Sequence, residues 1–388
     1  MNTNEGQDSA RAQNAGSAVY VVTNPSGANA VEAFIRDPAT GRLTHLGRYE
    51  TGGQGDHSTA AFTSHALVGD RRFLYAVNPG SDSISAFAVQ SDGSLRLLGT
   101  VPSGARRPVS LALHGNVLYV ANDGNIPPSA PQDQLPGSYA GFHVREDGRL
   151  EPIASSTIPL ERGESPGEIL FNHDGTRLIA CRLGTSIIDS FHVGPDAVLS
   201  RGATLAGQQG AFGAMFSPTH PAQLFVTLKG ALVLADTRPP APGVASYALT
   251  DEAPRQISVV TDPSSQDPCW LAVAPDGRRL WASSFIPRSL TLYAIDDDAR
   301  LTKLSAYIPA DGPGSIDVAL DPAGRFLYQL RAFDVPSGGH VPTIPQIAVL
   351  EVTGDSADGG LRLVQSLPLA ADLDHTGVMG MRVIDLDR

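Results

Sequence analysis

One short apolar strand pattern recurs seven times along the chain, and this repeat constrains the fold more than any other feature. Each copy carries a large apolar residue in the same place, at successive spacings of 55, 44, 60, 46, 56 and 47 residues. The seven marker residues are Tyr20, Tyr75, Tyr119, Ile179, Phe225, Trp281 and Tyr328. A period of about 50 residues is typical of the four-stranded blades of β-propellers.

The residues around each marker strand predict the rest of the blade. An apolar strand and a tight turn precede it, as in Leu271–Gly277, and an alternating strand follows, as in Ser83–Val89. Alternation with a period of two, broken by Asp-Gly and Pro-Asp-Gly, is the hairpin signature. The sequence therefore predicts an all-β fold, a seven-bladed β-propeller of four-stranded antiparallel blades. The first unit lacks its innermost strand, and we expect Val378–Asp385 to supply it and close the ring.

The repeat also decides the domain organisation. A chain of 388 residues has room for two average domains, but the repeat runs unbroken from about residue 18 to 386. We therefore expect one domain over 18–388, preceded by a disordered polar tail over 1–17. Forty glycines and thirty prolines agree with a fold of many turns.

Three Pro-rich insertions lengthen the connections between the second and third strands of blades three, five and seven. They cover residues 123–138, 230–243 and 332–345. Loops at this junction share a rim with the loops that join successive blades. Insertions on one face of a repeat protein often mark its binding face, although surface loops also lengthen at little cost.

Composition excludes several classes of function. No stretch approaches the roughly 20 apolar residues that span a bilayer, and the polar start has no signal-peptide core, which predicts a cytoplasmic protein. A formal charge of −12 disfavours nucleic acid and anionic membranes as partners. The two cysteines, Cys181 and Cys269, cannot form a disulfide framework and lack zinc-site spacing, so we expect both to be buried.

Aligning the blades identifies positions that should face the central funnel. One position ends the marker strand and includes Asn78, Asn122, Arg182, Lys229 and Arg331. The other lies in the innermost strand and includes Ser110, Glu168, Gly213, Trp270 and Asp317, with His65 near the equivalent place in blade two. A charged side chain in this narrow space needs a partner or a ligand.

Two blades carry a carboxylate and an arginine at the same spacing. Glu168 precedes Arg182 by fourteen residues, and Asp317 precedes Arg331 by fourteen. Adjacent antiparallel strands would then bring each pair side by side. An arginine could grip a substrate carboxylate while the acid exchanges a proton, or the pairs could be structural ion pairs between strands.

Other residues are weaker candidates. Lys229, one of two lysines, could bind an anion or lie solvated at the rim, and Trp270 could form an apolar wall or pack between blades. His57 and His375 lie in loops near the chain join, where each could be a general acid or base or a solvated side chain. We find no nucleophile elbow, phosphate-binding loop or metal-ligand spacing, so we expect neither metal nor cofactor.

At this point the sequence resembles a known family. The units Pro275–Trp281 and Pro322–Tyr328, the strand phrases Phe73–Asn78 and Ser83–Phe87, and Asp92–Leu98 resemble the lactonase-type seven-bladed propellers. That family includes a bacterial 6-phosphogluconolactonase and a fungal 3-carboxy-cis,cis-muconate cycloisomerase. The resemblance implies the propeller fold and activity on small lactones or carboxylated molecules.

The chain departs from the residues that lactonase-active members usually carry. Those members have an Arg-His pair, an Asn-Glu pair and an Asp-Arg pair. The corresponding positions here hold Phe212-Gly213, Leu228-Lys229 and Ser284-Phe285.

Together these features lead to two hypotheses. The first is a lactonase-like or cycloisomerase-like enzyme that acts on a small anionic substrate by acid–base chemistry in the funnel. Glu168, Asp317 and His57 would be catalytic, and the substrate would be bound by Arg182, Arg331, Lys229, Trp270, Asn78, Asn122 and His375. The second is a non-catalytic propeller that binds a protein or small ligand on its loop-bearing rim.

Overall fold

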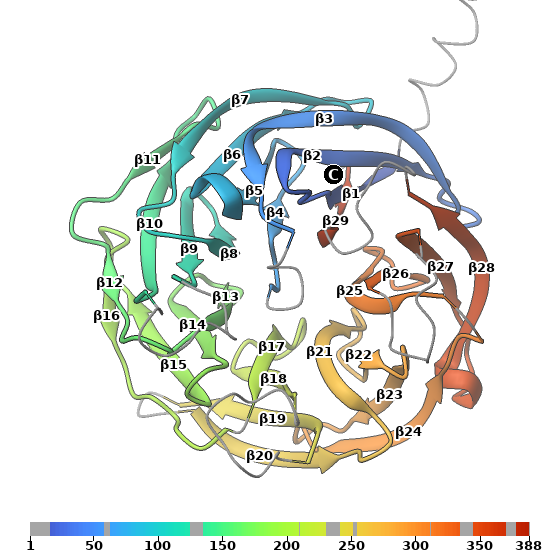
Figure 1. The fold of residues 1–388 in the computed structure, drawn as a ribbon. Coiled ribbons are helices and arrows are strands. Elements are labelled where there is room, and N and C mark those ends of the chain that lie inside the picture. Colours follow the sequence, from blue (N-terminus) through green and yellow to red (C-terminus); the bar gives the residue numbers. More distant parts are fainter. Residues whose placement is uncertain are drawn as a thin grey trace, which may run out of the picture.

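Seven four-stranded blades form a closed ring around a central channel (Figure 1). The coordinates are a computed structural model that describes residues 16–57, 63–124, 135–208, 210–229, 241–250, 254–310, 312–333, 344–369 and 378–387. The prediction of a seven-bladed β-propeller is confirmed.

Each blade runs from an innermost strand to an outermost one. Blade one contains β29 (Met379–Asp385), β1 (Ser17–Val22), β2 (Gly27–Arg36) and β3 (Leu43–Gly55), and blade two contains β4 (Leu67–Gly69), β5 (Phe73–Asn78), β6 (Ser83–Val89) and β7 (Leu95–Pro102). Blade three contains β8 (Pro108–His114), β9 (Val117–Asn122), β10 (Ser138–Val144) and β11 (Leu150–Pro152), with β12 (Ile158–Pro159) also pairing with β10.

Blades four to seven repeat this order. Blade four contains β13 (Pro166–Phe171), β14 (Arg177–Arg182), β15 (Ile187–Val193) and β16 (Leu199–Arg201), and blade five contains β17 (Ala211–Phe216), β18 (Gln223–Leu228), β19 (Gly243–Leu249) and β20 (Pro254–Thr261). Blade six contains β21 (Gln266–Val273), β22 (Arg279–Ile286), β23 (Leu290–Ile295) and β24 (Leu301–Tyr307), and blade seven contains β25 (Gly314–Leu320), β26 (Phe326–Phe333), β27 (Gln346–Val352) and β28 (Leu361–Pro368). Among the described residues, short 3₁₀ turns cover Pro79–Ser81 and Ala357–Gly360.

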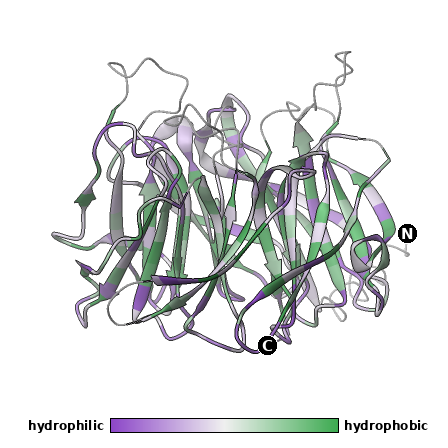
Figure 2. Ribbon diagram, turned by 90° about the horizontal axis from the view of Figure 1, so that it is seen from below, coloured by the Kyte–Doolittle hydropathy of each residue, from purple (hydrophilic) through white to green (hydrophobic). Residues whose placement is uncertain are grey.

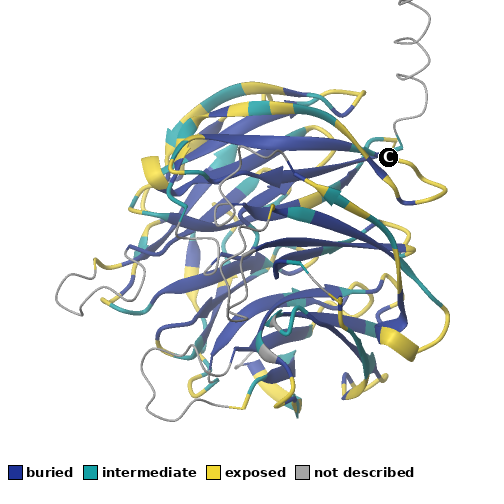
Figure 3. Ribbon diagram, turned by 45° about the vertical axis from the view of Figure 1, so that its right-hand side comes forward, coloured by how far each residue is buried: buried dark blue, intermediate teal, exposed yellow. Residues whose placement is uncertain are grey.

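Burial explains why the strands differ in sequence. The second strands are almost continuously buried between neighbouring blades, and accordingly they are runs of apolar residues (Figure 3). The outermost strands β7, β20 and β28 share one burial pattern in which exposed and partly buried residues follow a buried first residue. Apolar residues fill the strands, and hydrophilic residues gather toward the loops (Figure 2).

The closing strand stands where the sequence predicted it. β29 pairs antiparallel with β1, and Ala18 lies opposite Ile384. In Figure 1 this last strand lies beside the first strand of the chain. The N-terminal and C-terminal segments thus share one blade, which protects the edge of β1 that would otherwise be open.

Five of the seven marker residues are aromatic residues whose polar atom bonds to the neighbouring blade. The hydroxyl of Tyr20 donates to the carbonyl of Gly93 at 2.8 Å, and that of Tyr75 donates to Gly148 at 2.9 Å. In each case the acceptor lies in the turn between the third and fourth strands of the next blade. Tyr119, Trp281 and Tyr328 make the same kind of bond to the next blade. A buried aromatic ring with one polar atom therefore fills the interface and satisfies a turn carbonyl.

Candidate functional site

A short segment before β4 crosses the central channel. The backbone N–H of Ser64 donates to the carbonyl of Gly167 in blade four at 3.2 Å, and the carbonyl of Thr63 accepts from the Trp270 indole of blade six at 2.9 Å. The carbonyl of His65 accepts from the N–H of Leu111 in blade three at 3.0 Å. We call residues 63–66 the crossing segment. It explains why β4 is only three residues long, since the chain before it spans the channel instead of continuing the strand.

The innermost strands share an irregularity at the level of the crossing segment. The pairing register with the second strand shifts at this level in β8, β13, β17, β21, β25 and β29. Such bulges bend a strand and leave ladder groups unpaired. Polar side chains of the preceding blade bind the amides here: Ser110 Oγ accepts from Ile169 at 3.0 Å, and Asp317 Oδ2 accepts from Met381 at 2.7 Å.

His65 bonds to Glu168 of blade four and lines the same cavity as Asp317 of blade seven. Its Nδ1 lies 2.5 Å from Oε1 of Glu168, whose side chain is fully buried. The imidazole is 27% exposed, so it can be reached from the channel while Glu168 cannot. Burial lowers the pKa of His65, but the charge and hydrogen bond of Glu168, with the charge of Asp317, outweigh it and raise that pKa above its ordinary value.

Asp317 is the second acid–base group of this cluster. Its two oxygens accept the amides of Val318 and Met381, each at 2.7 Å. Burial raises the pKa of Asp317 to about 7, although the charge of His65 and the two amide bonds oppose the shift. A carboxyl group with a pKa near neutrality is suited to proton transfer under physiological conditions.

Two cavities meet at His65. One has a volume of about 260 Å³ and is lined by His65, Trp270, Asp317 and Arg382 among others. It extends to the turns between first and second strands, at Pro218, Pro275 and Pro322. A second cavity of about 420 Å³ shares His65, Met215 and Arg382 with the first. Both therefore extend from the crossing segment toward the face that carries the short hairpin turns.

Sequence reasoning missed Arg382, the one arginine that lines both cavities. Within the described part of the chain its guanidinium makes no hydrogen bond or ion pair. The side chain of Arg382 is exposed to the channel. Loss of part of its hydration there lowers the pKa of Arg382, and the charge of Asp70 partly offsets this, but an arginine stays charged. Period-two alternation along the closing strand could have found it, since Arg382 follows Gly380 by two residues.

The expected Glu168–Arg182 and Asp317–Arg331 pairs are wrong. Glu168 lies opposite Cys181 in the register, and Asp317 lies opposite Leu330. The bulges add residues to the innermost strands and so break the alignment that equal spacing implied. Arg182 instead forms ion pairs with Glu164 and, at 2.8 Å, with Asp189, and Arg331 Nε donates to the carbonyl of Pro313 at 3.2 Å.

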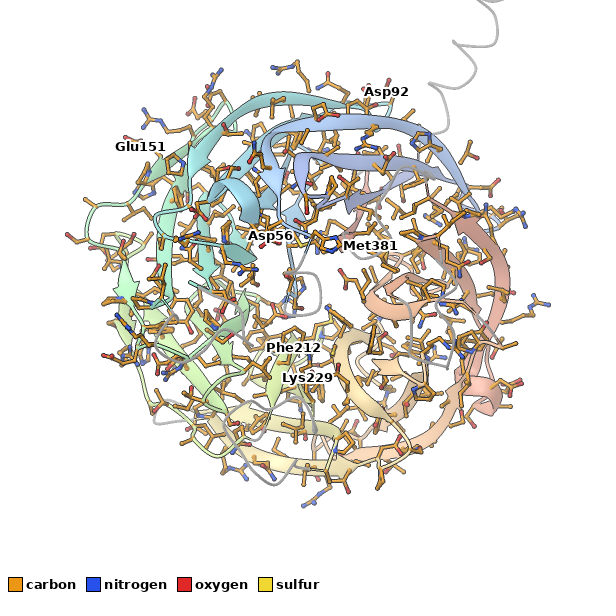
Figure 4. The ribbon with its side chains drawn as sticks, in the orientation of Figure 1. Asp56, Asp92, Glu151, Phe212, Lys229 and Met381 are labelled. Carbon is orange, nitrogen blue, oxygen red and sulfur yellow. The ribbon has the colours of Figure 1, made fainter. Side chains whose placement is uncertain are left out.

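Lys229 is not solvated at the rim. Its side chain is fully buried, with Nζ 3.4 Å from Asp267 Oδ1 and 4.3 Å from the centroid of the Phe212 ring. Burial lowers the pKa of Lys229, but the charge of Asp267 and the contact with the Cys269 sulfur outweigh it and raise that pKa. Phe212 in turn packs edge-on against Trp270, with 6.0 Å between ring centroids. Figure 4 shows Phe212 and Lys229 together on blade five. This lysine thus supports the wall behind Trp270.

The remaining candidates do not line the two cavities. The Asn78 amide donates to Ser85 Oγ at 2.7 Å within blade two. The Asn122 amide donates at 3.1 Å to the carbonyl of Ser103, which follows β7, and so links blade three to blade two. His57 follows β3 at the rim. His375 lies outside the described residues, as do most residues of the three insertions.

Asp123 is a buried carboxylic acid that lies outside both cavities. Its Oδ1 accepts the hydroxyl of Ser165 at 2.8 Å, and burial raises the pKa of Asp123 to about 7 against the opposing effects of Ser165 and Arg107. The folded protein therefore holds this proton between about pH 4 and 7. Because the unfolded chain has already released this proton in that range, the free energy of unfolding falls between about pH 4 and 7 and levels off above 7.

Replacing Asp123 by Asn should remove that loss, because an amide cannot ionise and can still accept from Ser165. We expect the free energy of unfolding of Asp123→Asn, relative to the unmodified protein, to be about 2 kcal/mol higher at pH 8.5 than at pH 5. Urea unfolding at both pH values measures this. The exposed Asp298→Asn is the control, and equal pH dependence in Asp123→Asn and the unmodified protein would contradict the prediction.

The fold and this site define a class: a channel-bearing β-propeller with an acid–base cluster at the centre of its ring. The family model described as "Lactonase, 7-bladed beta-propeller" matches residues 10–126. The resemblance that the repeat suggested is therefore confirmed, at low sequence identity. No curated protein matches the sequence significantly.

Solved structures share the fold over almost the whole chain. A candidate 6-phosphogluconolactonase from Bacteroides fragilis is 20% identical with a TM-score of 0.71, and covers 95% of this chain and 98% of its own. One from Bacteroides uniformis is also 20% identical, with a TM-score of 0.72 and coverages of 95% and 100%. A periplasmic gluconolactonase from Pseudomonas aeruginosa is 19% identical, with a TM-score of 0.68 and coverages of 95% and 99%.

The described residues include no helix with the length and apolar composition needed to span a bilayer. Within the same ranges no three His, Cys, Asp or Glu side chains form a group that could hold a metal ion.

Proposed function

We propose that this protein opens or closes the ring of a small carboxylated lactone by acid–base catalysis in the central channel. One observation carries the proposal: His65 and Asp317 line the same cavity as Arg382, a cation free to bind an anion. Glu168 lies behind His65 and lines neither cavity, so it is a positioning residue. The likeness to lactonase-type propellers supports the choice of a lactone.

Each group has a role that its surroundings favour. Asp317, with a pKa of about 7, accepts a proton from water as the water oxygen bonds to the lactone carbonyl carbon. The ring C–O bond then breaks, and cationic His65 donates a proton to the departing alkoxide oxygen. Water is thereby added across the ring ester, which yields a hydroxy acid. Arg382 holds the substrate carboxylate throughout.

Ring closure of an unsaturated acid is a second activity that the same groups could support. Cationic His65 could protonate the double bond while Arg382 holds a carboxylate, and the remaining carboxylate would bond to the resulting cationic carbon. This direction needs no positioned water. The raised pKa of His65 supports this second activity, because it keeps a proton donor in the cavity of Arg382 near neutral pH.

The position of the histidine explains how this chain departs from lactonase-active relatives. Gly213 stands where those relatives usually have histidine, and a Cβ there would collide with the carbonyl oxygen of Cys269. A histidine at 213 is therefore sterically excluded. In our proposal His65 enters the channel from blade two and takes over the acid–base role.

Turnover of a panel of lactones and unsaturated acids, followed by proton release and NMR, tests the proposal. We expect kcat/KM for one lactone class to rise through about pH 7 as Asp317 ionises. Asp317→Asn should lose this limb and about 100-fold in kcat. The exposed Asp297→Asn is the matched control.

Two results would contradict this function. One is equal turnover by Asp317→Asn and the unmodified protein. The other is thermal stabilisation by lactones with no turnover of any compound, which would favour the non-catalytic, ligand-binding propeller.

A further inference from the structure

We infer that the channel takes a carboxylated ligand with an apolar body and rejects phosphorylated sugar lactones. This inference rests on the proposed function, because it names the substrate class of the same site. The structural neighbours are named for sugar lactones and phosphorylated sugar lactones. We infer a different ligand for this chain, because the side chains in its channel do not suit a sugar phosphate.

One level of the channel wall below His65 is apolar. It is formed by the innermost-strand residues that pair with the seven marker residues of the second strands. These residues are Val68, Ala112, Leu170, Met215, Ala272, Ala319 and Arg382, and all of them line the cavities. Six of the seven are apolar, and Arg382 alone carries a charge. A ligand that lies at this level therefore meets hydrocarbon from six blades.

Few polar side chains are available for sugar hydroxyl groups. The polar residues of the 260 Å³ cavity are Ser64, His65, Asp317, Asp321 and Arg382. Asp321 is already engaged, since its Oδ1 accepts the amides of Arg325 and Phe326 at 2.6 and 2.7 Å. A polyhydroxylated ligand would leave hydroxyl groups without partners against Met215 and Ala272, which costs binding free energy.

The charge of the channel suits a carboxylate better than a phosphate. Arg382 provides one guanidinium fork, which matches the two oxygens of one carboxylate. Asp317 lines the same cavity, and the charge of Asp70 acts on Arg382, so the second negative charge of a phosphate dianion is disfavoured there.

The geometry also places the ligand relative to the acid–base groups. Arg382 directly follows Met381, whose amide donates to Asp317 at 2.7 Å. A carboxylate on Arg382 therefore lies within one strand residue of the Asp317 level. The apolar body of the ligand then extends over Met215 toward Trp270, whose indole is held by the carbonyl of Thr63.

Calorimetric titration with two acids of equal charge tests this inference. Cyclohexanecarboxylate has an apolar body, gluconate has a polyhydroxylated one, and 6-phosphogluconate adds a phosphate. We expect cyclohexanecarboxylate to bind at least about 10-fold more tightly than either sugar acid. Cyclohexylmethanol, which lacks the charge, should bind at least about 10-fold more weakly than the carboxylate.

Variants identify the site of binding. Arg382→Met should weaken cyclohexanecarboxylate binding at least about 10-fold, whereas Arg278→Met, on an exposed turn of blade six, should leave it unchanged. Met215→Gln should reduce the ratio by which the protein binds cyclohexanecarboxylate more tightly than gluconate. The inference is overturned if gluconate or 6-phosphogluconate binds as tightly as cyclohexanecarboxylate, or if Arg382→Met has no effect. Circular dichroism confirms that each variant is folded.

The two proposals can fail separately. Selective binding of cyclohexanecarboxylate without turnover of any lactone or unsaturated acid would overturn the proposed function and leave the ligand class standing. Turnover of a phosphorylated sugar lactone that Asp317→Asn abolishes would overturn the ligand class and leave the function standing.

Discussion

Replacing His65 by Asn is expected to lower kcat by about 100-fold or more, with a small change in KM. The amide nitrogen of Asn can take the place of Nδ1 and keep the contact with Glu168, but nothing then replaces the proton donor at Nε2. Asn also tolerates the left-handed backbone of this position, where φ is 53°, so the crossing segment should keep its path. The loss would therefore report the missing imidazole.

Steady-state kinetics on the best substrate of the panel measure this effect. His192→Asn is the matched control, because His192 is exposed on β15 and lies outside both cavities. If His65→Asn keeps kcat within about threefold of the unmodified protein, His65 is not the proton donor. A parallel loss of thermal stability in His65→Asn would instead assign it a structural role.

Removal of residues 378–388 is expected to abolish cooperative folding. β1 is buried along its whole length, and without β29 its inner edge would face the channel unpaired. The same deletion removes the Met381 amide from Asp317, which would leave a buried acid with one bond fewer. It also removes Gly380, whose left-handed backbone lets the strand pass close to Ala66 of the crossing segment.

Scanning calorimetry and size-exclusion chromatography measure this outcome. We expect the truncated chain to lose its sharp thermal transition and to aggregate through the open strand edge. A chain that ends at Leu386 keeps all of β29 and is the control. A cooperative transition in the shorter chain within about 5 °C of that control would show that closure by β29 is dispensable.

Much of the fold could be read from local sequence. The marker strands and their Asp-Gly breaks predicted the blades. The first blade lacked one strand in the sequence, and this predicted that β29 closes the ring. These features depend on residues that are neighbours in the chain or repeat at a fixed spacing. Glu168 and Asp317 were likewise placed in the innermost strands correctly, because the same repeat aligns them.

The failures concern side-chain direction and long-range contact. Arg182 was expected beside Glu168, but the bulge in β13 shifts the register and turns Arg182 toward Glu164 and Asp189. A bulge of this kind has no marker in the alternation of apolar and polar residues, so spacing alone could not locate it.

The sequence by itself thus determined the number of blades, their strand order and how the ring closes, because alternation and turn chemistry act over a few residues. Only the tertiary structure decided which groups share the channel. His65 meets Glu168 of blade four across the crossing segment, and Arg382 comes to the same cavity from the far end of the chain. Their meeting depends on the closure of the whole ring, which no local pattern records.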